Sequence, residues 1–349
     1  MRSILIFSAC LLAGSADARQ CLLNGEEVNP DNGSTTAGKT GVMSCRRDDG
    51  SLWYEQALQN GEHLGLDRFH DDDGSVRERH VNAQGNTEGM AREWYPNGQL
   101  KREGEYRNAD AIGVHRNFFA DGEPQSLNVY PVADKPAAVA IEWDAQGRLR
   151  RLSCAQQSLI EDDLTLCGHQ SEVVTKLVDQ RGQVQERRTL KAGRTLRSDF
   201  LSDGERLAGS IEYTPDGRIE RQFHDNGEPA RELVVADGYA VRRQEWYMNG
   251  ALKLRTTQEA RERQARSVDE RFRDDGTLAE IEHKLDGKTQ RRERYDAKGG
   301  LVEDWEHAPA GHVSRHRKFD GQGGLLLDEE LYPDGSRKVL KAEAEIGGS

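Results

Sequence analysis

Apolar and aromatic side chains are scarce in this sequence. Hydrophobic residues make up 35% of its 349 residues and aromatic residues only 6%. An average globular domain is nearer half apolar. The length allows two or three domains, but the composition argues against deep, closed cores in them. No stretch beyond the first residues holds ~18 uncharged apolar residues, so we expect no membrane-spanning segment there. The sequence favours a thin architecture in which most residues touch water.

Positive charge is also in deficit, because 49 Lys and Arg residues face 61 Asp and Glu residues and give a formal net charge of −12. This balance disfavours nucleic acid or anionic lipid as the main partner, since both attract basic surfaces. We therefore expect neither nucleic-acid binding nor stable membrane insertion.

Motifs of known active sites are missing. The sequence contains no G-x-S-x-G, H-E-x-x-H or P-loop pattern. Glu93 and Glu245 each precede a Trp-Tyr pair and are conceivable catalytic carboxylates. We interpret both as solvated strand residues that pair with a neighbouring arginine. The sequence thus predicts no catalytic residue, no cofactor and no enzymatic activity.

Two groups of residues invite a metal interpretation. Asp-rich turns at 48–50, 71–74 and 274–276 resemble calcium loops. Calcium needs six or more oxygen ligands around one point, and the spacing fits neither an EF-hand nor the nonapeptide repeat. Aspartate is also favoured in turns for its bonds to the backbone. The histidine candidates are His307, His312 and His316. We predict no metal site, because ligands spread over a solvated sheet are usually unoccupied.

The first residues are typical of a secretory signal. Arg2 precedes a short apolar stretch at 4–12, and Ala16-Asp17-Ala18 fits an A-x-A cleavage site. A buried N-terminal strand is one alternative. A lipoprotein cut before Cys10 is another, although Phe7-Ser8-Ala9-Cys10 is a poor lipobox. We expect export to the periplasm or another oxidising compartment.

Removal of that signal would leave four cysteines, Cys21, Cys45, Cys154 and Cys167. In an exported chain they suggest two disulfides with three possible connectivities. We choose the local pairing, Cys21–Cys45 and Cys154–Cys167, in which each loop contributes roughly 3 kcal/mol. No C-x-x-C pair is present, which argues against a zinc site.

Turn signals recur with a period of about 24 residues. An aromatic residue is followed three or four positions later by glycine, often after Asp or Asn. The marker glycines are Gly50, Gly74, Gly98, Gly122, Gly147, Gly204, Gly227, Gly250, Gly276, Gly299 and Gly323. Asn-Gly and Asp-Gly suit tight hairpin turns. We therefore predict an all-β fold, an elongated antiparallel meander of ~24-residue β-hairpin repeats. Unrelated turns in a β-sandwich are the alternative.

One interval breaks the period, because 35 residues separate Gly147 from Gly182 and include Cys154 and Cys167. The expected segments are 1–18 (signal peptide), 19–45 (disulfide-linked cap), 46–150 (first repeat block), 151–181 (disulfide-pinned insertion), 182–341 (second repeat block) and 342–349 (flexible tail).

The aromatic residues divide into two predicted roles. Adjacent side chains on a strand point to opposite faces, so one member of each Trp-Tyr pair should be buried. We assign to a core stripe Tyr95, Phe119, Phe223, Tyr247, Phe272, Tyr295 and Phe319. The candidate partner-binding residues are Trp53, Trp94, Trp246, Trp305, Glu93 and Glu245. Tryptophan often dominates binding energy at interfaces. Packing of the tryptophans against the sheet's own twist is the alternative.

Residues 85–108 contain a recognisable set of residues: Gly85, Gly89, Trp94, Tyr95, Asn97, Gly98, Leu100, Lys101, Gly104 and Tyr106. With this set the segment resembles MORN-repeat variants, and most closely the YwqK-type antitoxin, or immunity, family. A weaker copy holds Gly61, Gly65, Phe69 and Gly74, and the second half mostly lacks the early glycines.

The resemblance implies a hairpin-repeat fold. It also implies a periplasmic immunity protein that binds and occludes a secreted antibacterial toxin acting in the envelope, with a type VI phospholipase or lipase effector as the favoured class. One alternative is a repeat-built envelope scaffold, and a second is a glycan- or lipid-binding module.

Overall fold

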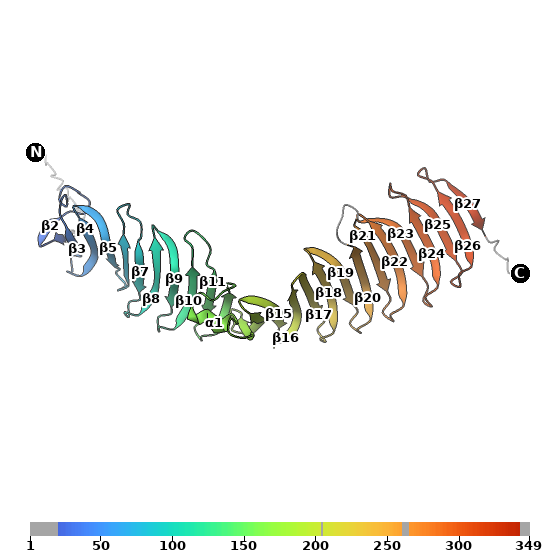
Figure 1. The fold of residues 1–349 in the computed structure, drawn as a ribbon, viewed down its shortest axis with the longest axis horizontal. Helices are drawn as coiled ribbons and strands as arrows, with labels where there is room; N and C mark the ends of the chain where they lie inside the picture. The colour runs from blue at the N-terminus through green and yellow to red at the C-terminus, as the bar shows by residue number, and fades with distance from the viewer. Residues whose placement is uncertain (1–19, 204, 260–264, 343–349) are drawn as a thin grey trace, which may run out of the picture. The chain divides into compact units, whose positions relative to one another are not determined.

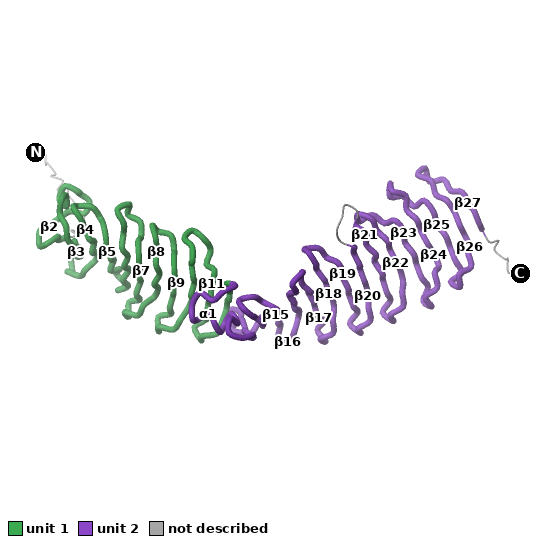
Figure 2. The backbone as a smooth tube through the Cα atoms, in the orientation of Figure 1, with its two compact units in different colours: residues 1–155 green, residues 156–349 purple. Residues whose placement is uncertain are grey.

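The computed structural model describes residues 20–203, 205–259 and 265–342. The predicted signal peptide, Cys10, the marker Gly204 and all but the first residue of the predicted tail lie outside the described residues. Two compact units divide the chain, unit 1 at Met1–Ala155 and unit 2 at Gln156–Ser349 (Figure 2). Each unit contains one antiparallel sheet, so the predicted all-β meander of hairpins is confirmed.

The sheet of unit 1 has twelve strands in the described residues, in the order β12 to β3 followed by β1 and β2. Its strands are β1 Gln20–Leu23, β2 Glu26–Val28, β3 Gly41–Arg46, β4 Leu52–Gln59, β5 Glu62–His70, β6 Val76–Val81, β7 Gly89–Trp94, β8 Leu100–Arg107, β9 Asp110–Phe118, β10 Pro124–Tyr130, β11 Val139–Trp143 and β12 Leu149–Ser153. The segment predicted as a cap supplies β1, β2 and all but the last residue of β3. Of these strands β3 pairs with β4, β1 pairs with β3, and β2 pairs with β1.

The sheet of unit 2 has fifteen strands in the described residues, and every strand pairs with its neighbours in sequence (Figure 1). They are β13 Val173–Val178, β14 Val184–Lys191, β15 Arg194–Ser202, β16 Arg206–Thr214, β17 Gly217–Phe223, β18 Pro229–Ala236, β19 Tyr239–Trp246, β20 Leu252–Glu259, β21 Arg266–Phe272, β22 Leu278–Leu285, β23 Lys288–Tyr295, β24 Leu301–His307, β25 Val313–Phe319, β26 Leu325–Leu331 and β27 Arg337–Ala342. A short helix, α1 Glu161–Leu166, precedes them. The predicted insertion thus contains α1 and β13.

The turn between β7 and β8 shows how the repeat marker works. The Gly98 amide donates to the Tyr95 carbonyl at 2.9 Å, and the Tyr95 amide donates to the Gln99 carbonyl at 2.8 Å. The Asn97 side chain accepts the Gln99 amide at 3.0 Å. Gly98 has φ 82°, a region that residues with a Cβ rarely enter. Each marker residue therefore has a separate part in closing the turn.

Side chains in one turn also form hydrogen bonds to the next turn at the same end of the strands. The Tyr95 hydroxyl donates to the Phe118 carbonyl at 2.9 Å, and the Asn97 amide donates to the Ala120 carbonyl at 2.8 Å. Equivalent contacts join Tyr247 to Phe272, Asn249 to Asp274, His224 to Trp246, and Asn226 to Met248. We call these contacts the turn ladder. They link successive hairpins without using a core.

A β-bulge follows many of these turns. Trp94 pairs with Leu100 and Glu93 with Arg102, which leaves Lys101 as the extra residue. Lys253 is the equivalent extra residue in β20. Bulges bend a strand and increase its twist, so their recurrence curves each sheet along its length.

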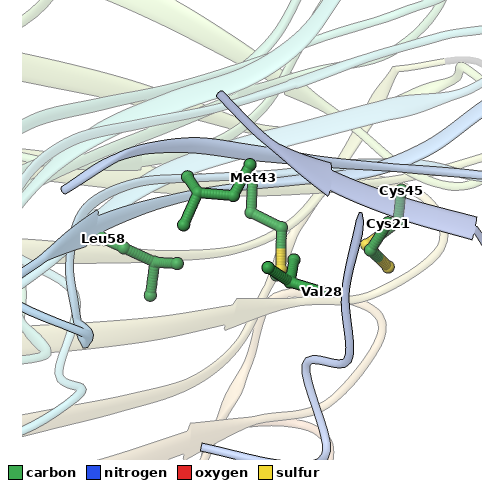
Figure 3. Packing of buried hydrophobic residues seen from close by; sticks show 6 residues of the cluster. Cys21, Val28, Met43, Cys45 and Leu58 are labelled. Carbon is green, nitrogen blue, oxygen red and sulfur yellow. A yellow bond between two sulfur atoms is a disulfide. The ribbon is translucent and has the colours of Figure 1, made fainter. Parts of the chain in front are cut away.

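A cluster of buried apolar residues lies at the start of unit 1. The cluster contains Cys21, Leu23, Val28, Met43, Cys45 and Leu58 (Figure 3). Trp53 and Tyr54 pack against it. The predicted Cys21–Cys45 disulfide is confirmed. Cys154 and Cys167 are also disulfide-bonded. Further apolar residues are buried in β10 to β14 and at Cys167: Leu127, Val129, Val139, Ala140, Ile141, Leu149, Leu152, Cys167, Leu177, Val178 and Leu190. From β15 on, Val235 is the only buried hydrophobic residue among those that the structure describes, which fits the low apolar content.

Candidate interaction surface

The aromatic residues of the repeat marker occupy two different positions. Tyr95 and Tyr247 each begin a turn, whereas Trp94 and Trp246 each end a strand. Phe223, Phe272, Tyr295 and Phe319 also end strands, and Phe119 begins a turn. The predicted stripe of seven equivalent aromatics is therefore wrong. An aromatic three residues before the glycine lies in the turn, and one four residues before it lies on the strand.

Trp94 borders a hollow of about 540 Å³ on one face of unit 1. Its lining includes Arg68 and His70 from β5, Val76 from β6, and Trp94 from β7. We call this face of the sheet the Trp94 face. The ring of Trp94 is half-buried, so part of it remains available for contact.

Charges of alternating sign cross the Trp94 face from strand to strand. Each residue of this charged row is paired directly with the next in the sheet register. The row consists of Glu55, Arg68, Glu78, Arg92, Glu103 and Arg116. Arg68 contacts Glu55 at 3.0 Å and also contacts Glu78. The hydrogen bond to Glu78 raises the pKa of the Arg68 guanidinium. Three members of the row, Arg68, Glu78 and Arg92, line the hollow.

The opposite face of unit 1 carries a groove of about 630 Å³. His115 stands between Tyr106 and Tyr130 in two edge-to-face contacts, each with 5.0 Å between ring centroids. Gly104 makes room for them, because a Cβ at Gly104 would lie 2.3 Å from Nδ1 of His115. The groove therefore depends on a glycine of the repeat motif.

Glu93 lies beside this groove and not on the Trp94 face. Its carboxylate is buried and contacts Lys101 and Arg102, each at 2.6 Å. Burial next to two cations identifies it as a structural partner of the β7–β8 hairpin. Trp53, another predicted contact residue, packs on the N-terminal cluster with its ring 5.6 Å from Tyr54.

In unit 2 the predicted residues divide between two faces. Trp246 lies on the face opposite Glu245, which Arg243 contacts at 2.9 Å. Trp305 shares the face of Glu245 and stacks on His316 with 5.4 Å between ring centroids. The guanidinium groups of Arg292 and Arg294 each lie 5.7 Å from the Trp305 ring centroid. Within each unit, the predicted contact residues therefore do not share one face of the sheet.

Asp49 of an acidic turn and His316 have partners within the protein. Asp49 accepts the Ser51 amide at 2.8 Å, and hydrogen bonds from the side chain and backbone of Ser51 lower the pKa of Asp49. His316 contacts Glu329 at 3.1 Å. In the part of the chain that the structure describes, no three His, Cys, Asp or Glu residues are placed to hold a metal. Over the same residues, no helix combines the length and apolar character that crossing a bilayer requires.

Sequence reasoning missed the charged row, the groove and the turn ladder. The row has a signal in the sequence, because Arg68, Arg92 and Arg116 follow one another at the repeat period of 24 residues. Aligning the repeats would therefore have found it. The faces themselves depend on the bulges, which shift the register and leave no clear pattern in the sequence.

Residues 87–108, which contain β7 and β8, match the family model described as MORN repeat variant. This match confirms the MORN resemblance for the hairpin that carries Trp94. MORN repeats suggest a repeat-based protein-interaction scaffold. A search of curated proteins gave no match.

Several solved structures resemble parts of the chain weakly. Staphylococcus aureus TarM in complex with Fondaparinux is 11% identical at a TM-score of 0.23, over 28% of this chain and 19% of that chain. TcdB2-TccC3 is 12% identical at a TM-score of 0.18, over 91% of this chain and 20% of that chain. A putative 6-phosphogluconolactonase from Bacteroides fragilis is 10% identical at a TM-score of 0.17, over 88% of this chain and 91% of that chain. The chain spans about a fifth of the first two structures. At these TM-scores the likenesses carry no argument.

Proposed function

We propose that this MORN-repeat protein is an exported immunity protein that binds a secreted antibacterial toxin through the Trp94 face. The observation that carries the contact surface is Trp94 itself, half-buried at the rim of a hollow and surrounded by ordered charges. The toxin as partner rests on the resemblance to YwqK-type immunity proteins. The interaction scaffold is the broader function that the repeat supports.

The geometry of the Trp94 face suits recognition of a protein surface. Strong interface contacts usually combine an aromatic anchor with ordered charges that exclude wrong partners. The side chains of Arg68 and Arg92 are partly exposed to solvent. Ion pairs with Glu55 and Glu78 orient Arg68, and an ion pair with Glu103 orients Arg92. Binding of this kind requires no catalytic residue, because covering the active site or the membrane-facing surface of a toxin inhibits it.

The disulfides suit the compartment that this function needs. All four cysteines of the described residues are disulfide-bonded, and such bonds persist in oxidising compartments such as the bacterial periplasm. A toxin acting in the envelope would meet the protein there. A phospholipase or lipase effector is the class that we would test first, and the net charge of −12 would speed capture of a basic toxin.

The immunity function is tested by deleting the gene in its own host and exposing the cells to toxin-secreting sister cells. We expect loss of protection on deletion, rescue by the natural protein, and weak rescue by Trp94→Ala. Loss of a hot-spot aromatic of about 2 kcal/mol weakens binding about 30-fold. Trp246→Ala is the matched control, because Trp246 ends the equivalent strand of unit 2. Full survival of the deletion strain would refute the immunity function.

Glycan binding is a second candidate, favoured by the groove of unit 1. Its tyrosines offer edges and faces for a sugar ring, and the amides of Asn117 and Asn128 also line it. Calorimetric titration with peptidoglycan fragments distinguishes the two functions. Binding that is lost in Tyr106→Ala and retained in Trp94→Ala would support the glycan and oppose the toxin.

A further inference from the structure

The last five strands of unit 2 alternate in net charge. With histidine counted as neutral, β23, β25 and β27 each carry +3, and β24 and β26 each carry −3. Because the strands lie side by side in this order, each acidic strand is bordered by two basic strands. The basic strand β27 has a single acidic neighbour, since in the described residues it pairs with β26 alone.

Inside the sheet, the alternation produces close ion pairs on both sides of a strand. Asp304 of β24 contacts Arg291 of β23 at 3.0 Å and Arg317 of β25 at 2.6 Å. Arg315 of β25 also contacts Asp328 of β26 at 2.7 Å. Each inner strand thus has an oppositely charged neighbour on either side.

At the β27 edge of the sheet, the cationic side chains form only long ion pairs. Arg337 lies 3.4 Å from Glu329, and Lys338 lies 3.8 Å from Glu330, which are longer contacts than the inner pairs. The side chains of Arg337 and Lys338 are 67% and 63% exposed. All six residues of β27 are exposed. An edge strand also presents unpaired backbone N–H and C=O groups to any segment that can pair with it.

We infer that the outer edge of β27 binds an extended acidic segment of a partner protein, which joins the sheet as a further strand. Backbone hydrogen bonds supply the affinity in this mode of recognition, and the side chains choose the sequence. Because basic and acidic strands alternate here, the added strand should carry carboxylates, as β24 and β26 do. The inference goes beyond the proposed function, because it concerns a different surface in unit 2 and does not require a toxin.

A second copy of the same strand is a poor occupant. Two β27 strands paired antiparallel about Val339 and Leu340 would place Lys338 opposite Lys341. Like charges directly opposite each other on neighbouring strands destabilise the pairing. Basic edges are a common safeguard against self-association, and the same charges admit an acidic strand.

Two peptides of seven residues test the inference on the full chain. The acidic probe copies β24 (residues 301–307), and the basic probe copies β25 (residues 313–319). We expect about a tenfold preference for the acidic probe at low salt, as three cross-strand charge pairs suggest. Hydrogen exchange should show new protection at β27. Added salt should weaken the binding, because the charges are exposed.

The double variant Lys338→Glu/Lys341→Glu is the matched control, because exposed charges can be reversed without disturbing a core. It should reverse the preference and bind the basic probe. Equal binding of both probes, protection away from β27, or an unchanged preference in the double variant would overturn the inference. Two other occupants are also tested. If the acidic probe binds at least about tenfold more tightly to a variant that ends at Ala342 than to the full chain, residues 343–349 occupy the edge. If the protein associates with itself and the acidic probe disrupts that association, a second copy of the chain occupies the edge.

Discussion

The Cys21–Cys45 disulfide should stabilise one end of unit 1 and leave the rest of the sheet largely unaffected. The bond joins β1 to β3 across a sequence separation of 24 residues. Hairpin repeats contact only their neighbours, so each segment has its own local stability. The double variant Cys21→Ala/Cys45→Ala is the perturbation that tests this.

The expected cost has two parts. Closure of a loop of this size restricts the unfolded segment by about 3.5 kcal/mol in the chain-entropy model. Both cysteines are almost fully buried, at 1% and 0% exposure, so removing their sulfur atoms leaves a small void in the N-terminal cluster. A void of methyl size costs about 1 kcal/mol. The local free energy of unfolding of β1–β4 should therefore fall by about 4–5 kcal/mol.

Hydrogen exchange followed by mass spectrometry measures this fall strand by strand. The amides of β1–β4 should exchange much faster in the variant, and those of β7–β10 should keep their rates. Cys154→Ala/Cys167→Ala is the control and should leave β1–β4 unchanged. Unchanged exchange in β1–β4 of the first variant, or equally faster exchange in all strands of unit 1, would refute the reasoning.

Three smaller changes test other parts of the structure. Tyr247→Phe removes the 3.0 Å hydrogen bond to the Phe272 carbonyl and should lower the unfolding free energy in urea by about 1 kcal/mol; no change would remove the turn ladder as a source of stability. Gly104→Ala places a Cβ 2.3 Å from the His115 ring and should cost about 1–3 kcal/mol in thermal unfolding, whereas a neutral effect would show that the groove does not need the glycine. Backbone hydrogen bonds lower the pKa of the Asp320 carboxyl from 3.8. Its contribution to stability is therefore present above pH 3.8 and is lost as the pH falls through the lowered pKa. Asp320→Asn keeps a neutral acceptor and should flatten the acid-unfolding curve, and an unchanged curve would contradict this role.

Local turn chemistry made the fold predictable from the sequence. Gly98 has a positive φ, and so has each of the other marker glycines that the structure describes. The sequence also shows which cysteines are close along the chain, and Cys21–Cys45 followed from that.

The faces were harder to predict because they depend on single-residue register. Tyr95 and Trp94 differ by one position and therefore have different roles, one in the turn ladder and one at the end of a strand. Bulge residues such as Lys101 shift the pairing further. Glu93 and Trp94 were predicted together, yet they lie on opposite faces of the same strand.

The central claim is that the protein binds a toxin through the Trp94 face. Hydroxyl-radical footprinting of the complex with a toxin encoded beside this protein's gene tests it most directly, because the method reports on side chains face by face. We predict protection of Trp94 and His70, with Tyr106 and Tyr130 on the opposite face reacting as in the free protein. Protection of the two tyrosines without protection of Trp94, or failure of the two proteins to form a complex, would contradict the account.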